Sequence, residues 1–267
     1  MSTLTFGLPR VVSRDEWLKA RKELLAEEKA LTRARDALAA KRRRLPMVKV
    51  TKDYVFTASG GKRVRLVELF EGRRQLYVHH FMWNDERGHC MGCTAAADTG
   101  FDNPKMRAVL AEKDVTFVAV SRAPIAAIEK TQQEKGWTFP WYSSEGSDFN
   151  YDFHVTLDEA KAPIEHNYRN KEELIAAGMK AEDLKGDWTV NSVFVRDGDA
   201  VYHTYSAFAR GLDHLFLPAA FLDMTPYGRQ EDWEDLPEGW PPPGVRMLRG
   251  VIEPRLESEV SRGCFSG

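Results

Sequence analysis

The stretch QLYVHHFMWNDERGHCMGCTAAAD, residues 75–98, decides the fold. Its first eight residues, Gln75 to Met82, are largely apolar, which is typical of a strand buried in the middle of a sheet. A polar loop follows, and the alanine-rich residues from Thr94 to Asp98 favour a helix. The Cys-x-x-Cys motif of Cys90 and Cys93 therefore stands between a strand and the start of a helix.

The pattern of strand and helix continues beyond this stretch. Residues 115–120 form another apolar run, residues 124–135 suit a helix, and residues 138–142 suit a short strand. Asp197-Gly198-Asp199 then separates two strand-like runs, residues 189–196 and 200–205, as in a β-hairpin. Parallel units followed by an antiparallel pair predict an α/β fold of the thioredoxin-like type. Its three layers are a mixed sheet with helices on both faces.

The chain begins with a long amphipathic helix. Ser13 and Glu16 form a capping box, and the helix is expected to end at the basic run before Pro46. Apolar residues recur every seven positions along it: Trp17, Leu24, Leu31 and Leu38. This stripe suits a helix that lies on its own domain or on a second copy of the chain, so a homodimer through this helix is one expected arrangement.

Three segments are predicted from these patterns. They are the N-terminal amphipathic helix in residues 1–46, the thioredoxin-like domain in residues 47–226, and an irregular tail rich in proline and tryptophan in residues 227–267. Three consecutive prolines, residues 241–243, exclude regular structure in the middle of that tail.

The composition narrows the classes of partner. The 267 residues carry 38 Lys and Arg against 40 Asp and Glu, a formal net charge of -2, which gives no general attraction to nucleic acid. No apolar run reaches the roughly 20 residues that cross a bilayer, so no membrane partner is expected. The N-terminus has no signal-peptide pattern, which predicts a cytoplasmic protein. Three cysteines in a chain of this length are not a disulfide framework.

The cysteine pair is the main candidate for chemistry. A helix amino end stabilises a thiolate, here at Cys90, and Cys93 lies about one helical turn on, where it can attack a disulfide formed by Cys90. We expect His89 to tune the thiolate, and we include Arg122 and His203 as further candidates because a cation near a thiolate lowers its pKa. The sequence thus favours a redox enzyme with Cys90 and Cys93 as its reacting residues.

Two other interpretations stay open at this stage. Copper or zinc would suit two thiolates and one or two imidazoles, and His80, His89, Cys90 and Cys93 are the ligand set of that interpretation. Strand side chains alternate, so His79 and His80 point to opposite faces and at most one faces the cysteines. The third interpretation is a non-catalytic module that associates through its helix and tail. Cys264, near the C-terminus, is expected to be an incidental thiol.

The chain resembles the thioredoxin-like family known as domain of unknown function 899, over about residues 11–229. The resemblance rests on the motifs Arg42-Arg43-Arg44-Leu45-Pro46, Asp53-Tyr54-Val55-Phe56, His80-Phe81-Met82, Cys90 to Cys93, Val120-Ser121-Arg122-Ala123-Pro124, Trp141-Tyr142-Ser143-Ser144, Asp148 to Phe153, His203-Thr204-Tyr205-Ser206 and Leu222 to Pro226.

This resemblance implies a dithiol-disulfide oxidoreductase. For this activity we expect no bound cofactor and an unknown disulfide-bearing or small-molecule substrate. Two features depart from a working thioredoxin. The loop from Trp83 to His89 is longer than usual, and Val190-Asn191-Ser192 stands where thioredoxins carry a proline beside the disulfide.

Overall fold

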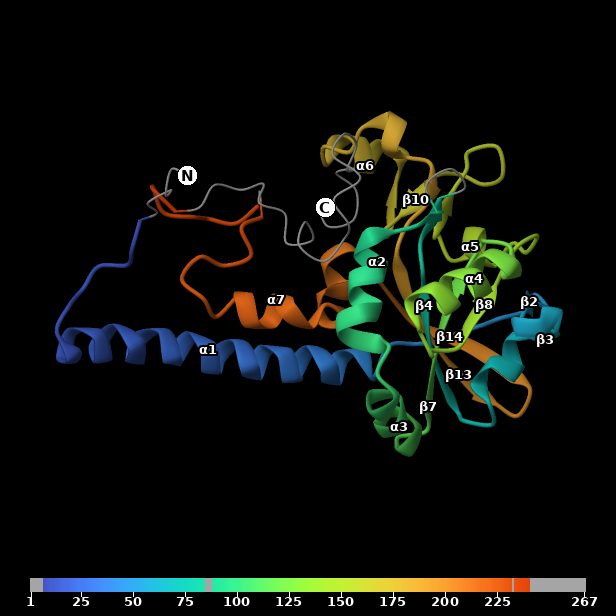
Figure 1. Ribbon diagram of the computed structural model, residues 1–267, viewed down its shortest axis with the longest axis horizontal. Coiled ribbons are helices and arrows are strands. Elements are labelled where there is room, and N and C mark those ends of the chain that lie inside the picture. The colour runs from blue at the N-terminus through green and yellow to red at the C-terminus, as the bar shows by residue number, and fades with distance from the viewer. Residues whose placement is uncertain (1–6, 85–87, 232, 241–267) are drawn as a thin grey trace.

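A computed structural model describes residues 7–84, 88–231 and 233–240 of the chain (Figure 1). The main sheet has eight strands in the order β1-β14-β13-β4-β7-β8-β2-β3. In chain order these strands are β1 (Val48–Lys49), β2 (Val55–Thr57), β3 (Arg63–Arg65), β4 (Gln75–His80), β7 (Val115–Ser121), β8 (Trp141–Ser143), β13 (Val190–Asp197) and β14 (Ala200–Phe208). Three two-stranded pairs lie outside it: β5 (Trp83–Asn84) with β6 (Gly88–His89), β9 (Thr156–Leu157) with β12 (Gly186–Asp187), and β10 (Glu165–His166) with β11 (Arg169–Asn170).

The centre of the sheet has the predicted mixed layout. Strands β4, β7 and β8 run parallel to one another, and β13 and β14 form an antiparallel hairpin that adds to the side of β4. The α-helices are α1 (Arg14–Arg42), α2 (Met91–Ala96), α3 (Pro104–Glu112), α4 (Ile125–Lys135), α5 (Phe149–Asp152), α6 (Lys171–Ala176) and α7 (Leu217–Leu222). The chain is therefore a mixed α/β protein with a thioredoxin-like core, as predicted.

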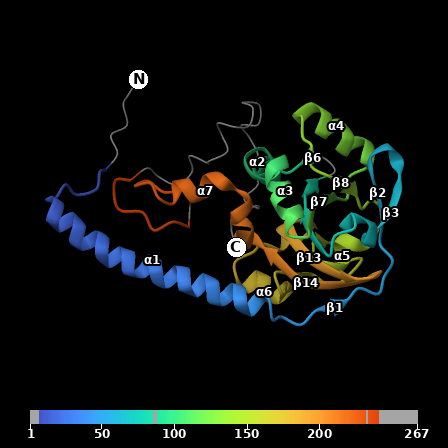
Figure 2. The ribbon, with the colours of Figure 1, turned by 90° about the horizontal axis from the view of Figure 1, so that it is seen from below.

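The two faces of the sheet bury different side chains because strand residues alternate. One face, which we call the cysteine face, packs Phe81, Phe117 and Ala119 against α2, the π-helical turn Ala97–Phe101 and α4. The opposite face packs Val78, Val118 and Phe194 against α5 and the 3-10 helix Leu66–Phe70. Helical segments thus cover both faces (Figure 2). Cys90 and Cys93 both belong to the cluster on the cysteine face.

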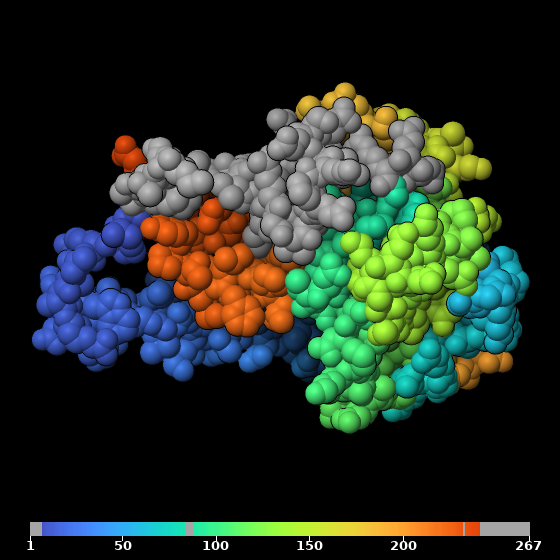
Figure 3. Space-filling view, viewed as in Figure 1, coloured from blue at the N-terminus to red at the C-terminus, as the bar shows by residue number. Residues whose placement is uncertain are grey.

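Helix α1 projects from the body of the protein (Figures 1 and 3). It begins with the predicted capping box, in which the Ser13 amide donates to the Glu16 carboxylate at 3.0 Å and the Glu16 amide donates to the Ser13 hydroxyl at 3.3 Å. None of its residues is buried, and Trp17 and Leu38 are 46% and 56% exposed. An exposed apolar stripe of this kind would be covered by a second copy, so the homodimer stays a prediction.

The C-terminal segment is described only in part. Residues 227–231 and 233–240 form neither helix nor strand, and residues 241–267, which include the three prolines and Cys264, lie outside the described residues. Within the part of the chain that the structure covers, no helix has both the length and the apolar character to span a membrane.

Candidate functional site

The cysteine pair stands at the start of α2. Cys90 is the N-cap residue, held by its amide hydrogen bond to the Met82 carbonyl at 3.0 Å, and its own carbonyl accepts the first helical bond from Thr94 at 2.9 Å. Cys90 is partly exposed, whereas Cys93 is 1% exposed in the core. The two side chains are joined by a hydrogen bond. One sulfur is thus within reach of a substrate, and the other stands directly behind it.

Burial has the largest effect on the pKa of Cys93. It raises the pKa of the Cys93 thiol well above its ordinary value, and the hydrogen bond to Cys90 raises that pKa further. The Cys93 thiol also donates to the Thr189 hydroxyl at 3.3 Å, and Thr189 immediately precedes β13. A threonine hydroxyl therefore stands beside the sulfurs, directly before Val190-Asn191-Ser192, which was predicted to occupy the position of the thioredoxin proline. Thr189 was not among the predicted site residues, because no pattern in the sequence marks it.

His79, and not His80, lies on the cysteine face. Its ring packs against Phe101 at 5.0 Å between centroids, and it lines a small cavity of about 20 Å³ together with Cys93 and Thr189. This volume holds about one water molecule. The Nδ1 atom of His79 pairs with Asn191 Oδ1 at 2.8 Å, so Nδ1 is the donor and the lone pair is on Nε2. The buried Nε2 atom has no hydrogen-bond partner among the described residues.

His80 belongs to the opposite face. Its ring stacks on Phe149 at 5.3 Å, and its Nε2 atom pairs with the Ser192 hydroxyl at 2.9 Å. The structure therefore does not bring His80 to the cysteines with which the metal interpretation grouped it, because strand alternation places the ring across the sheet from Cys93. No group of three His, Cys, Asp or Glu side chains within the described residues is arranged to hold a metal ion.

His89 stands beside the pair, but burial makes it neutral. Its Nδ1 atom pairs with the Thr94 hydroxyl at 2.8 Å, and its ring lies between Trp83 and Trp137, with centroids 6.0 and 6.1 Å away. Burial lowers the pKa of His89 below its ordinary value, and Lys135 lowers it further. At neutral pH the ring is mostly uncharged, so His89 shapes the site without supplying a full cation.

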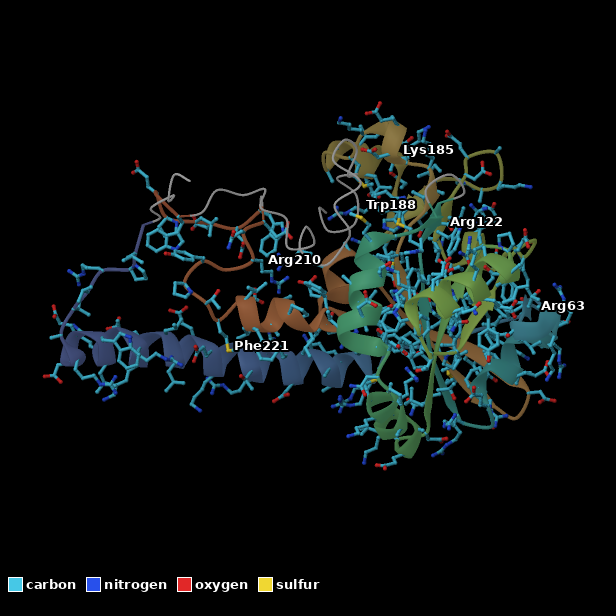
Figure 4. The ribbon with its side chains drawn as sticks, in the orientation of Figure 1. Arg63, Arg122, Lys185, Trp188, Arg210 and Phe221 are labelled. Atoms are coloured by element: carbon cyan, nitrogen blue, oxygen red, sulfur yellow. The ribbon has the colours of Figure 1, made fainter. Side chains whose placement is uncertain are left out.

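Arg122 and His203 have other partners. The guanidinium of Arg122 donates to Asp187 at 2.7 Å and to the Tyr151 hydroxyl at 3.1 Å. In Figure 4, Arg122 lies at the end of the sheet where α2 begins. His203 packs against Phe153 on the opposite face of the sheet, with ring centroids 5.2 Å apart. The structure thus brings together Cys90, Cys93, His79 and His89, and it does not bring His203 to them.

The buried histidines should make the fold sensitive to acid. Burial lowers the pKa of His79 to about 4, that of His80 to about 3 and that of His166 to about 4. An unfolded histidine has a pKa of about 6.5, so between pH 6.5 and 4 the unfolded state binds more protons and stability falls as the pH falls. We expect each of the three histidines to lower the free energy of unfolding by about 2 kcal/mol when the pH falls from 7.5 to 5.

Urea unfolding at these two pH values measures this loss. The variant His80→Gln keeps an amide donor for Ser192 but cannot titrate, so its stability should differ less between the two pH values than that of the natural chain. Equal free energies of unfolding at pH 7.5 and pH 5 would contradict the assignment of these rings as neutral.

The chain matches one protein-family model and is similar to several solved structures. The family model described as "Bacterial protein of unknown function (DUF899)" matches residues 6–246. No curated protein matches the chain. Among solved structures, peroxidoxin BcpB from Mycobacterium tuberculosis is 16% identical, with a TM-score of 0.40 over 65% of this chain and 93% of that one. A PrxQ mutant from Xylella fastidiosa is 12% identical, with a TM-score of 0.39 over 62% of this chain and 88% of that one. A putative protein disulfide isomerase from Bacteroides thetaiotaomicron is 14% identical, with a TM-score of 0.36 over 65% and 87%.

Proposed function

Taking as premise that the chain belongs to the DUF899 family of bacterial proteins, we propose that it is a dithiol-disulfide oxidoreductase that works through Cys90 and Cys93. The observation that carries this proposal is the hydrogen-bonded pair of sulfurs, one partly exposed and one buried, at the start of a helix. A pair that serves only for packing would gain nothing from an exposed partner, whereas thiol exchange needs one sulfur open to the substrate.

The reaction proceeds in two exchanges. The Cys90 thiolate attacks one sulfur of a substrate disulfide, and the bond between the substrate sulfurs breaks to release a thiolate. The Cys93 sulfur then attacks Cys90, which forms the Cys90–Cys93 disulfide and releases the second substrate sulfur as a thiolate. The substrate gains two electrons and the pair loses two. An external dithiol must then reduce the pair before the next cycle.

Proton movements follow from the surroundings of Cys93. Transfer of its proton to His79 would be strongly unfavourable, because burial lowers the pKa of His79 to about 4 and raises the pKa of Cys93 well above its ordinary value. His79 therefore does not hold the proton at rest. The departing substrate thiolate is the better acceptor. His79 instead lines the cavity next to Cys93 as a neutral ring.

Oxidation of the purified protein tests this proposal. We expect glutathione disulfide to convert the reduced protein to a form with a Cys90–Cys93 disulfide, two hydrogen atoms lighter in that peptide, and dithiothreitol to reverse the change. The variant Cys264→Ser removes the third cysteine of the chain and should behave in the same way. Recovery of both Cys90 and Cys93 as free, alkylatable thiols after oxidation would overturn the proposal.

A further inference from the structure

A second cavity lies on the opposite face of the sheet from the cysteines. It has a volume of about 380 Å³, and β1, α5 and β14 contribute to its walls. Figure 2 shows these three elements together at one side of the sheet. The volume falls in the range of cavities that hold small ligands, which begins at about 300 Å³. Its walls are mainly apolar, with the side chains of Val50, Phe153 and Phe208 among them.

A chain of four polar side chains, three of them buried, ends at the half-buried His203 on this cavity. His203 Nε2 pairs with the Ser206 hydroxyl at 2.8 Å, Ser206 pairs with the Ser192 hydroxyl at 3.0 Å, and Ser192 pairs with His80 at 2.9 Å. Ser192 and His80 are fully buried, and His80 Nδ1 has no hydrogen-bond partner among the described residues. Buried polar groups cost stability, so a chain of four that opens on a cavity indicates a prepared polar wall.

The charges at the cavity favour an anion. Two lysines, Lys49 and Lys52, and one carboxylate, Asp152, are among its lining residues, and Lys52 pairs with Asp152, which leaves the charge of Lys49. Asp152 is already satisfied, because it accepts from Lys52 at 2.7 Å and from the Tyr54 hydroxyl at 2.6 Å. Lys49 is exposed and its ammonium group has no ion-pair partner in the described part of the chain. A cationic ligand would therefore find the lining carboxylate, Asp152, already paired, whereas an anionic one would meet Lys49.

We propose that this cavity is a binding site for a small organic acid, one with a flat apolar body and a single carboxylate. The body lies against Phe153 and Phe208, and the carboxylate is directed to the side that carries Lys49 and Lys52. The polar wall of His203 and Ser206 provides hydrogen bonds to further oxygen atoms on the ligand. This site is distinct from the cysteine pair, since the sheet separates the two.

Binding of benzoate, with neutral benzamide as its matched probe, tests the site in the full-length protein. We expect saturable binding of benzoate by NMR titration, with amide shifts in residues 48–54 and 203–208 and none in residues 91–96. Benzamide should bind at least about fivefold more weakly, because it lacks the charge that meets the lysines. Lys49→Glu should weaken benzoate binding by a similar factor.

Two controls separate this proposal from its alternatives. Lys105→Glu makes the same charge reversal on the exposed surface of α3 and should leave benzoate binding unchanged. Cys90→Ser should also bind benzoate normally, so failure of the redox proposal would not affect this one. Absence of saturable binding, equal binding of benzoate and benzamide, or shifts confined to residues 91–96 would each overturn the proposed site.

Discussion

Cys93→Ser is expected to trap a covalent adduct on Cys90. With glutathione disulfide as substrate, the Cys90 thiolate still attacks and releases one glutathione, but no second sulfur is present to displace the other. The enzyme therefore stops as the Cys90–glutathione mixed disulfide until an external dithiol displaces the glutathione, and its turnover falls well below that of the natural chain. Intact-mass spectrometry should show one glutathione per chain, and peptide mapping should place it on Cys90.

Cys90→Ser provides the matched comparison. It removes the partly exposed sulfur and keeps the buried one, whose raised pKa and 1% exposure leave it protonated and out of reach. This variant should form no adduct at position 93 and should also lose turnover. Cys264→Ser keeps both Cys90 and Cys93 and should react with glutathione disulfide and turn over as the natural chain does. If the adduct instead formed on Cys93 in Cys90→Ser at the same rate, the assigned order of the two cysteines would be wrong.

Gly100→Ala is expected to produce the largest loss of stability. Gly100 belongs to the π-helical turn that continues α2, and a β-carbon there would lie 2.2 Å from the carbonyl oxygen of Leu215. This oxygen is main chain, so it cannot move aside as the end of a flexible side chain can. Overpacking of this kind costs typically about 1–3 kcal/mol. In a chain of this size such a loss lowers Tm by roughly 2–4 °C for each kcal/mol.

The same substitution should also disturb the cysteine site. Leu215 lines the cavity beside Cys93, so moving the 3-10 helix Ala209–Leu215 away from α2 would open that cavity. We expect alkylation of Cys93 to become faster in Gly100→Ala. Gly211→Ala is the matched control, because it lies in the same 3-10 helix and its new β-carbon would be 3.3 Å from a side-chain carbon of Ala207. If Gly100→Ala, Gly211→Ala and the natural chain all had the same Tm, the close packing of Gly100 against Leu215 would be contradicted.

Local patterns in the sequence were enough to predict several elements. The run before the cysteines forms β4, the Cys90 position is the N-cap of α2, and Asp197-Gly198-Asp199 turns between β13 and β14. The capping box of Ser13 and Glu16 is also present as predicted. Each of these depends on residues close together in the chain, where hydrogen-bonding side chains and apolar periodicity act directly.

Other features depend on contacts between distant segments, and the sequence could not decide them. Alternation showed that His79 and His80 point to opposite faces, but not which face receives α2, since Leu76 and Tyr77 are both compatible with burial. His203 was a candidate by residue type alone, and the fold places it with Phe153 across the sheet from the cysteines. Thr189 is 96 residues from Cys93 along the chain and meets its sulfur only when β13 pairs with β4.

The sequence by itself determined that two cysteines stand one helical turn apart at the start of a helix, because spacing and local propensity set that arrangement. Only the tertiary structure decided which cysteine is buried, which imidazole faces it, and where the second cavity lies. The physical reason is that burial and pKa depend on what packs against a side chain from the rest of the chain, and the packing of a sheet between helical layers is a non-local property.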